Sequence, residues 1–66
     1  MKLKINGQEQ ELPARLTVLE LLEHMQIDPD GVAIAVNLQV VPRGEQATRV
    51  LNPGERVELV RAVGGG

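Results

Sequence analysis

Polar and apolar residues alternate at the start of the chain, which is the pattern of a β-strand with one buried face. Leu3 and Ile5 alternate with Lys2 and Lys4, so the two apolar side chains share one side of such a strand. Asn6 and Gly7 follow, and this dipeptide suits a two-residue turn in which both residues have a positive φ. Residues 8–12 then form the return strand. The chain therefore opens with a predicted β-hairpin.

The next patterned segment has helical spacing. Thr17 and Glu20 show the Thr-x-x-Glu spacing of a capping box, which marks a helix N-terminus. The helix should extend over residues 18–26. Its apolar positions recur at i, i+3, i+4 and i+7 and form one face: Val18, Leu21, Leu22 and Met25. A helix with one apolar face needs a partner surface, which we expect to be a sheet.

Residues 32–36 form a short apolar run rich in β-branched side chains, as is typical of an interior strand. The larger side chains of this run share the face that we expect under the helix. Ala33 and Ala35 line the opposite face, which is predicted to be smooth, apolar and open. Residues 40–43 predict a short edge strand that Pro42 ends.

The last third of the chain leads to a final strand. Residues 44–50 are polar and irregular, and Ala47 and Val50 are their expected anchors in the core. Residues 52–54 have the Asn-Pro-Gly sequence of a tight turn. The strand over residues 55–63 divides its side chains between two faces: Val57, Leu59, Arg61 and Val63 on one, and Glu58, Val60 and Ala62 on the other.

This order of elements predicts an α+β protein with a β-grasp fold. One main helix would cross one face of a mixed sheet of four to five strands, with the last strand parallel to the first. The fold would occupy residues 1–63, and residues 64–66 would form a flexible glycine tail. A ferredoxin-like split fold is the alternative, but its second helix would have to come from residues 44–50, which are too short and polar.

Composition narrows the function classes. The chain has 66 residues and no Phe, Tyr or Trp, so one thin core must be built from aliphatic side chains. No cysteine is present, which excludes disulfides, thiolate metal sites and cysteine nucleophiles. The net charge of −2 and the missing aromatic side chains argue against nucleic-acid binding. No apolar run approaches the roughly 20 residues of a membrane span, and we expect a soluble cytoplasmic protein.

Side-chain chemistry is sparse. His24 is the only histidine and lies on the flank of the predicted helix, and the chain has no serine. The carboxylates fit structural roles, in the solvated helix face (Glu20, Glu23) and in the turn after the helix (Asp28, Asp30). The terminal carboxylate of Gly66 remains; it is ionised at pH 7 and is a poor electrophile. Acyl chemistry there requires activation, for instance adenylation, by a partner enzyme, because this small chain has no nucleotide site of its own.

The glycine tail suits such a role. Without Cβ atoms, another protein's backbone can close around it from all sides, and three extended residues reach roughly 10 Å. The alternative is a frayed chain end without function.

Three stretches resemble the ThiS family of sulfur carriers: the helix opening at residues 17–22, residues 37–43 with their Val-Pro-Arg sequence, and the terminal Gly65-Gly66. The resemblance covers essentially the whole chain. It implies a β-grasp carrier in thiamine biosynthesis, a protein cosubstrate rather than an enzyme. Gly66 would be adenylated by an E1-like enzyme, ThiF, which uses ATP and magnesium, and the acyl-adenylate would become a thiocarboxylate.

The same resemblance implies the remaining partners. Sulfur would come from cysteine through a desulfurase persulfide and would pass to thiazole synthase, ThiG. Gly65 would be the unhindered neighbour of Gly66, and Gly64 departs from the minimal Gly-Gly pattern and lengthens the tail. Three alternatives stay open: a carrier for molybdopterin or tRNA thiolation, a ubiquitin-like modifier joined to lysines, and an interaction module with an inert tail.

The predicted docking surface is the open sheet face beside the tail. It combines side chains of the central and last strands: Ala33, Ala35, Val60 and Ala62. Apolar residues in this position adjoin the reactive terminus, which favours partner binding over scattered exposure. Arg61 and Arg43 are expected to pair with acidic groups on a partner.

Overall fold

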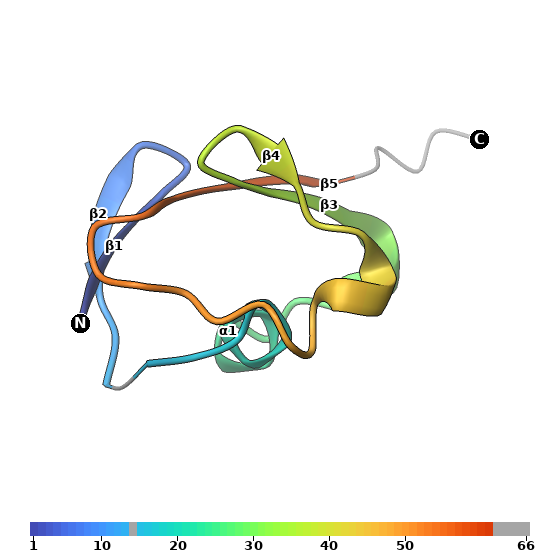
Figure 1. Ribbon diagram of the computed structural model, residues 1–66, viewed down its shortest axis with the longest axis horizontal. Coiled ribbons are helices and arrows are strands. Elements are labelled where there is room, and N and C mark those ends of the chain that lie inside the picture. Colours follow the sequence, from blue (N-terminus) through green and yellow to red (C-terminus); the bar gives the residue numbers. More distant parts are fainter. Residues whose placement is uncertain (14, 62–66) are drawn as a thin grey trace.

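The structure, a computed structural model, describes residues 1–13 and 15–61 of the chain. Five strands and one α-helix follow one another: β1 (Lys2–Ile5), β2 (Gln8–Glu11), α1 (Val18–His24), β3 (Val32–Val36), β4 (Gln39–Val40) and β5 (Arg56–Arg61). Two 3₁₀ turns, Pro29–Gly31 and Arg43–Glu45, flank β3 and β4. Figure 1 shows α1 on one side of the sheet, while the other side carries no helix.

The sheet has the strand order β2-β1-β5-β3-β4. β5 lies between β1 and β3, parallel to β1 and antiparallel to β3. The register places Ile5 beside Val57 and Val36 beside the same residue on the other side. This central, parallel position of the last strand confirms the predicted β-grasp arrangement. The ferredoxin-like alternative fails, since residues 44–50 form no α-helix: they contain the end of a 3₁₀ turn and an isolated bridge from Val50 to Thr17.

The first hairpin is joined to the last strand through its turn. Asn6 and Gly7 have φ values of 50° and 81°, as predicted for this dipeptide. The Asn6 N–H donates to the carbonyl of Val57 at 2.9 Å, and the Leu59 N–H donates to Asn6 Oδ1 at 2.8 Å. The turn residue therefore binds the strand that leads to the chain end.

Helix α1 begins at the predicted capping box. The Glu20 N–H donates to Thr17 Oγ1 at 3.2 Å, and the Thr17 N–H donates to Glu20 Oε1 at 2.9 Å. The helix ends at His24, two residues before the predicted end at Gln26. Gln26 has a φ of 59°, in the left-handed region that commonly ends helices.

The core lies between α1 and the covered face of the sheet. Eleven aliphatic side chains are buried: Leu3, Ile5, Leu12, Val18, Leu21, Leu22, Ile34, Val36, Val41, Leu51 and Val57. Met25, predicted on the apolar helix face, is half-buried at the margin. The three strands that contribute to the core, β1, β3 and β5, obey the alternation that the sequence predicted, with large apolar residues under the helix.

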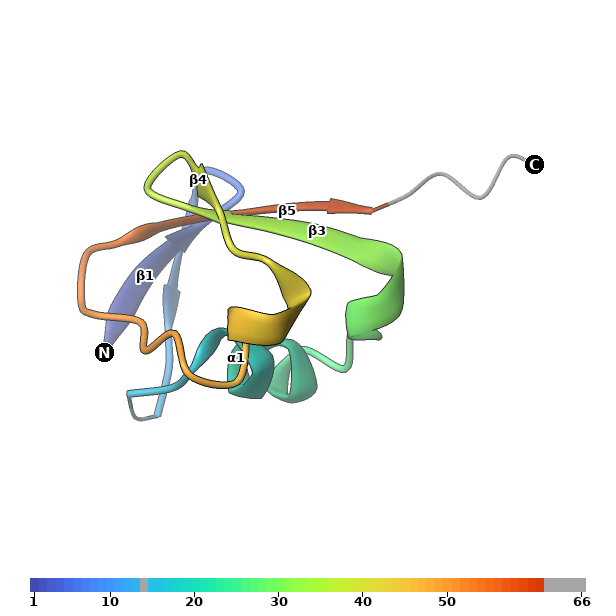
Figure 2. The ribbon, with the colours of Figure 1, turned by 45° about the vertical axis from the view of Figure 1, so that its right-hand side comes forward.

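The predicted anchors of the loop before β5 were wrong. Ala47 is exposed and Val50 is 40% exposed, whereas Gln46 and Leu51 are buried. Figure 2 shows this loop running close to α1. The Leu19 N–H at the helix start donates to the backbone carbonyl of Gln46 at 2.9 Å, which holds this part of the loop against α1.

The predicted position of the edge strand was also wrong. β4 is Gln39–Val40, rather than residues 40–43, because the chain turns tightly at Asn37 and Leu38. The Val41 N–H still donates to the carbonyl of Ile34 at 2.8 Å, and the chain then leaves the sheet into the second 3₁₀ turn.

Candidate functional site

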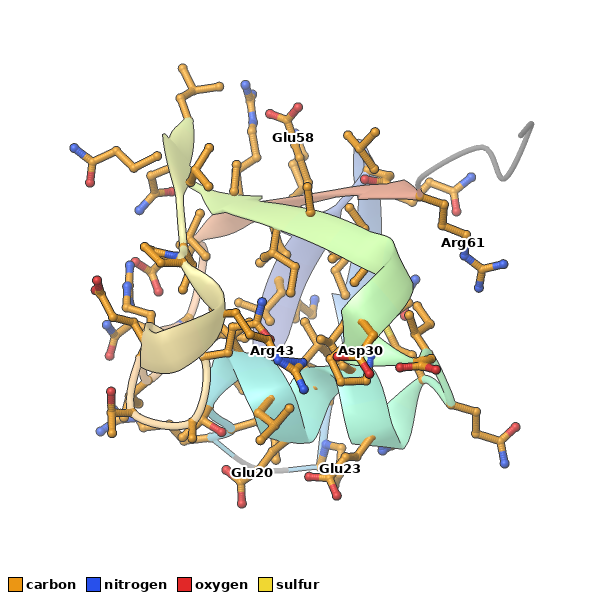
Figure 3. The ribbon with its side chains drawn as sticks, turned by 90° about the vertical axis from the view of Figure 1, so that its right-hand side faces the viewer. Glu20, Glu23, Asp30, Arg43, Glu58 and Arg61 are labelled. Atoms are coloured by element: carbon orange, nitrogen blue, oxygen red, sulfur yellow. The ribbon has the colours of Figure 1, made fainter. Side chains whose placement is uncertain are left out.

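Strand β5 delivers the chain end from the middle of the sheet. Its last residue, Arg61, lies opposite Val32 at the start of β3. Arg61 is exposed and projects from the end of the sheet in Figure 3. The predicted reactive Gly66, its neighbours Gly64 and Gly65, and Ala62 lie outside the described residues. The structure thus places the root of the tail, and the tail's chemistry rests on the sequence.

Two shallow hollows lie on either side of this root. One, of about 320 Å³, is on the helix side and is lined by Gln26, Ile27, Asp28, Gly31, Val32 and Arg61. The other, of about 310 Å³, is lined by Asp30, Gly31, Val32, Ala33 and Val60. A partner can therefore approach the end of β5 from both sides of the sheet.

The open face brings together the described members of the predicted docking surface. Ala33 lies directly opposite Val60 in the antiparallel pair of β3 and β5, and Ala35 lies opposite Glu58 on the same pair. Val60 is 64% exposed. The small alanine side chains beside it leave this part of the sheet low, so a partner's backbone can come close.

Sequence reasoning missed two members of this apolar region. Val40 lies opposite Ala35 on the other side of β3, and it is 73% exposed. Leu38, in the preceding turn, is 74% exposed. The apolar character of both residues was visible in the sequence, but their exposure depends on the position of β4 at the sheet edge.

Arg43 has a partner within the chain. Its Nη2 lies 3.0 Å from Asp30 Oδ1, and both side chains are largely exposed. Figure 3 shows the two side chains directed toward each other, from the two 3₁₀ turns. This exposed ion pair links the segments that flank β3. A role for Arg43 in binding a partner stays a prediction, in which the partner's acidic group would compete with Asp30.

The beginning of β5 is held by a polar cluster around Glu55. Its carboxylate accepts hydrogen bonds from Arg49 Nη2 at 2.9 Å, Asn37 Nδ2 at 3.0 Å and the Asn52 N–H at 2.6 Å. Burial raises the pKa of Glu55, but these bonds and the Arg49 charge outweigh it and lower the pKa below its ordinary value. The Arg56 N–H also donates to Asn37 Oδ1 at 3.1 Å. β5 is thereby fixed before it reaches the open end of the sheet.

The carboxylates of Glu20 and Asp28 have local structural partners. Glu20 belongs to the helix cap, and Asp28 Oδ1 accepts a hydrogen bond from the Asp30 N–H at 2.9 Å. His24 is exposed. In residues 1–13 and 15–61, no three His, Cys, Asp or Glu side chains gather into a potential metal site.

Among the described residues, no helix has the length and apolar character that a membrane crossing requires.

Within residues 1–13 and 15–61, the mixed sheet, its one covering helix and the central position of its last strand define a β-grasp protein. The ThiS family model matches residues 3–66, and the chain belongs to the ThiS family. The family predicted from the helix opening, the Val-Pro-Arg stretch and the terminal glycines is thus confirmed.

Three known proteins show how far the likeness extends. The sulfur carrier protein ThiS of Escherichia coli K12 is 35% identical over the full length of both chains. A crystal structure of the thiamine biosynthesis protein ThiS from Geobacter metallireducens superposes with a TM-score of 0.88, at 28% identity and with both chains fully covered. A thiazole synthase of Paramagnetospirillum magneticum is 41% identical over all of this chain, which spans 20% of that protein. The predicted class, a sulfur carrier of thiamine biosynthesis, is confirmed at this level.

Proposed function

We propose that Gly66 carries the sulfur as a C-terminal thiocarboxylate. The observation that carries this proposal is the extent of the family match, which runs through residue 66 and so includes the whole glycine tail. The chain has no cysteine, so its own side chains offer no thiol to hold sulfur. A sulfur atom that replaces an oxygen of the terminal carboxylate is carried without a side-chain thiol.

The proposed chemistry takes place in three steps. A carboxylate oxygen of Gly66 attacks the α-phosphorus of ATP, with pyrophosphate as the leaving group, and the product is an acyl-adenylate. The terminal sulfur of the donor persulfide then attacks the acyl carbon, AMP leaves with one of the original carboxylate oxygens, and the product is an acyl disulfide with the donor. A thiol finally attacks the donor sulfur of this S–S bond, which forms a new disulfide with the donor and releases the thiocarboxylate. ATP and magnesium belong to an E1-like adenylating enzyme, and a cysteine desulfurase persulfide is the proposed sulfur source. The chain itself is the cosubstrate.

The open face is the proposed contact with the adenylating enzyme. Val60, Ala33 and Ala35 form its described apolar part, with Ala62 next along the chain and Arg61 at the rim. This surface adjoins the tail root, so an enzyme that binds it holds Gly66 within reach of its nucleotide. The low alanine positions favour close packing against the partner.

Thiazole synthase is the proposed acceptor of the sulfur. The thiazole synthase of Paramagnetospirillum magneticum supports this choice, because a region similar to all of this chain is part of that protein. Two domains joined in one relative commonly act together when they are separate chains. The thiocarboxylate would deliver its sulfur during formation of the thiazole ring.

Intact-mass spectrometry tests the proposal. The protein is incubated with an E1-like adenylating enzyme, ATP, magnesium, a persulfide donor and a thiol that cleaves the acyl disulfide. The expected product has the mass change of one oxygen replaced by sulfur, located in the C-terminal peptide. Conjugates to lysine would instead indicate a ubiquitin-like modifier, and an unchanged mass would indicate an interaction module.

Deletion of Gly66 is the matched control. The deletion should abolish sulfur loading and leave the urea unfolding midpoint unchanged, since residue 66 comes after the last strand and the buried core residues in the sequence. Loading that survives the deletion refutes the thiocarboxylate mechanism.

A further inference from the structure

The turn between β3 and β4 contains a backbone conformation that its residue disfavours. Asn37 and Leu38 have φ values of 52° and 69°, in the left-handed region. Asparagine tolerates this region, because its short polar side chain bonds locally. Leucine does not, since its Cβ crowds the following carbonyl oxygen. Leu38 is therefore held in a strained conformation.

The same sheet contains an unstrained version of this turn. Asn6 and Gly7 join β1 and β2 with φ values of 50° and 81°, and the second position is glycine. Glycine is strongly preferred where both turn residues have positive φ. The turn geometry thus gives no reason for a leucine at the second position of the other turn.

Core packing gives no reason either. The Leu38 side chain is 74% exposed, the largest value among the exposed large hydrophobic residues of the described chain. A strained backbone that gains nothing from the turn or the core points to a role outside the folded domain.

The neighbours of Leu38 indicate what this role involves. Val40, two residues later, is 73% exposed and lies opposite Ala35 on the open face. Residues 37–40 contain no charged side chain. Charged residues lie near both ends of β3: Arg61 is opposite Val32 at one end, and Glu58 and Arg56 of β5 adjoin Ala35 and Asn37 at the other. The apolar residues of β3 and β4 thus form a strip along the edge of the open face, away from the tail root, and this strip ends at the exposed Leu38.

We infer that Leu38 is an anchor residue that inserts into an apolar recess of thiazole synthase. This inference rests on the proposed function. Thiazole synthase is the chosen occupant because the Paramagnetospirillum magneticum relative contains a region similar to this whole chain within a thiazole synthase. Leu38 and the tail root lie at opposite ends of β3, about 15 Å apart for a five-residue strand. Two contacts at that separation orient the carrier while its tail enters the acceptor site.

Turn-compatible substitutions separate the anchor from the fold. Leu38→Gly and Leu38→Asn both relieve the left-handed strain and remove the apolar side chain. We expect the thermal midpoint to rise by several degrees and the Kd for thiazole synthase from the same organism to increase about tenfold, as for loss of a buried anchor. Leu38→Met, which keeps the apolar bulk and the strain, should bind within about threefold of the unchanged protein.

Isothermal titration of the unloaded carrier into thiazole synthase gives the Kd values, and calorimetric unfolding gives the midpoints. Glycine and asparagine variants that bind as tightly as the unchanged protein overturn the anchor. Weaker binding to the adenylating enzyme alone overturns thiazole synthase as the occupant, as does a thiazole synthase that does not bind the unchanged carrier.

Sulfur loading, measured on the same samples, keeps the two proposals apart. If the protein without substitutions binds thiazole synthase through Leu38 but acquires no sulfur, the thiocarboxylate proposal is refuted and the proposal for Leu38 is supported. If it acquires sulfur but binds independently of Leu38, the proposal for Leu38 is refuted and the thiocarboxylate proposal is supported.

Discussion

The two faces of the sheet carry different side chains from the same strands. On β3, Ile34 and Val36 are buried under α1, while Ala33 and Ala35 alternate with them on the open side. The helix face gains stability from large side chains, whereas the small alanine side chains keep this part of the open face low. Period-two alternation therefore gives one face of a thin domain its buried core and leaves the other as the face on which we propose that partners bind.

We expect the largest difference in stability between two substitutions on opposite faces of β5. Val57→Ala removes a fully buried side chain from the covered face of β5, and we expect a loss of about 2 kcal/mol in the free energy of unfolding. Val60→Ala, on the open face, should change it by less than about 0.5 kcal/mol. Urea unfolding of both variants measures the difference. Equal losses would contradict the division between the faces.

The capping box stabilises the N-terminus of α1, the helix that covers the sheet. Thr17→Ala removes the hydroxyl that accepts from the Glu20 N–H, and it should cost about 1 kcal/mol. Thr48→Ala is the control, because the Thr48 hydroxyl only donates a 3.3 Å bond within an exposed loop. The urea midpoint should fall clearly for the first variant and barely for the second. An unchanged midpoint for Thr17→Ala would remove the capping box from the list of stabilising contacts.

The Glu55 cluster makes the position of β5 sensitive to acid. The folded pKa of Glu55 is lowered from 4.5, so its contribution to stability is fully present above that pH. The contribution is lost as the pH falls through the lower folded value. Glu55→Gln should therefore flatten the decline in the urea midpoint below pH 4.5. A decline as steep as that of the unchanged protein would show that other carboxylates dominate.

The smallest effect on stability, and a clear effect on binding, is expected for Val60→Asp. The side chain is already 64% exposed, so a carboxylate there remains hydrated and the unfolding midpoint should hardly move. Binding to the adenylating enzyme should weaken, because the charge would be buried against an apolar surface. Titration calorimetry measures the affinity, with Val50→Asp as a control outside the open face. Undiminished binding would exclude Val60 from the interface.

Most of the architecture followed from short-range patterns. The Asn6-Gly7 turn, the Thr17 cap and the alternation in β3 each depend on neighbouring residues, and each appears as predicted. The incorrect predictions concern residues whose burial depends on contacts with distant segments of the chain. Gln46 is buried in a loop whose backbone is bonded to the start of α1, a contact that no local pattern of residues 44–50 indicates.

The candidate site divides in the same way. Gly66 and the family were accessible from the sequence alone, since a glycine terminus needs no tertiary context and the motifs are contiguous. Only the tertiary structure decided that Ala33 faces Val60, and that Arg43 pairs with Asp30. Only the backbone showed that Leu38 is strained and exposed. Turns, caps and sequence motifs depend on neighbouring residues and can be predicted from them. Strand register, burial and backbone strain arise only when distant segments pack together.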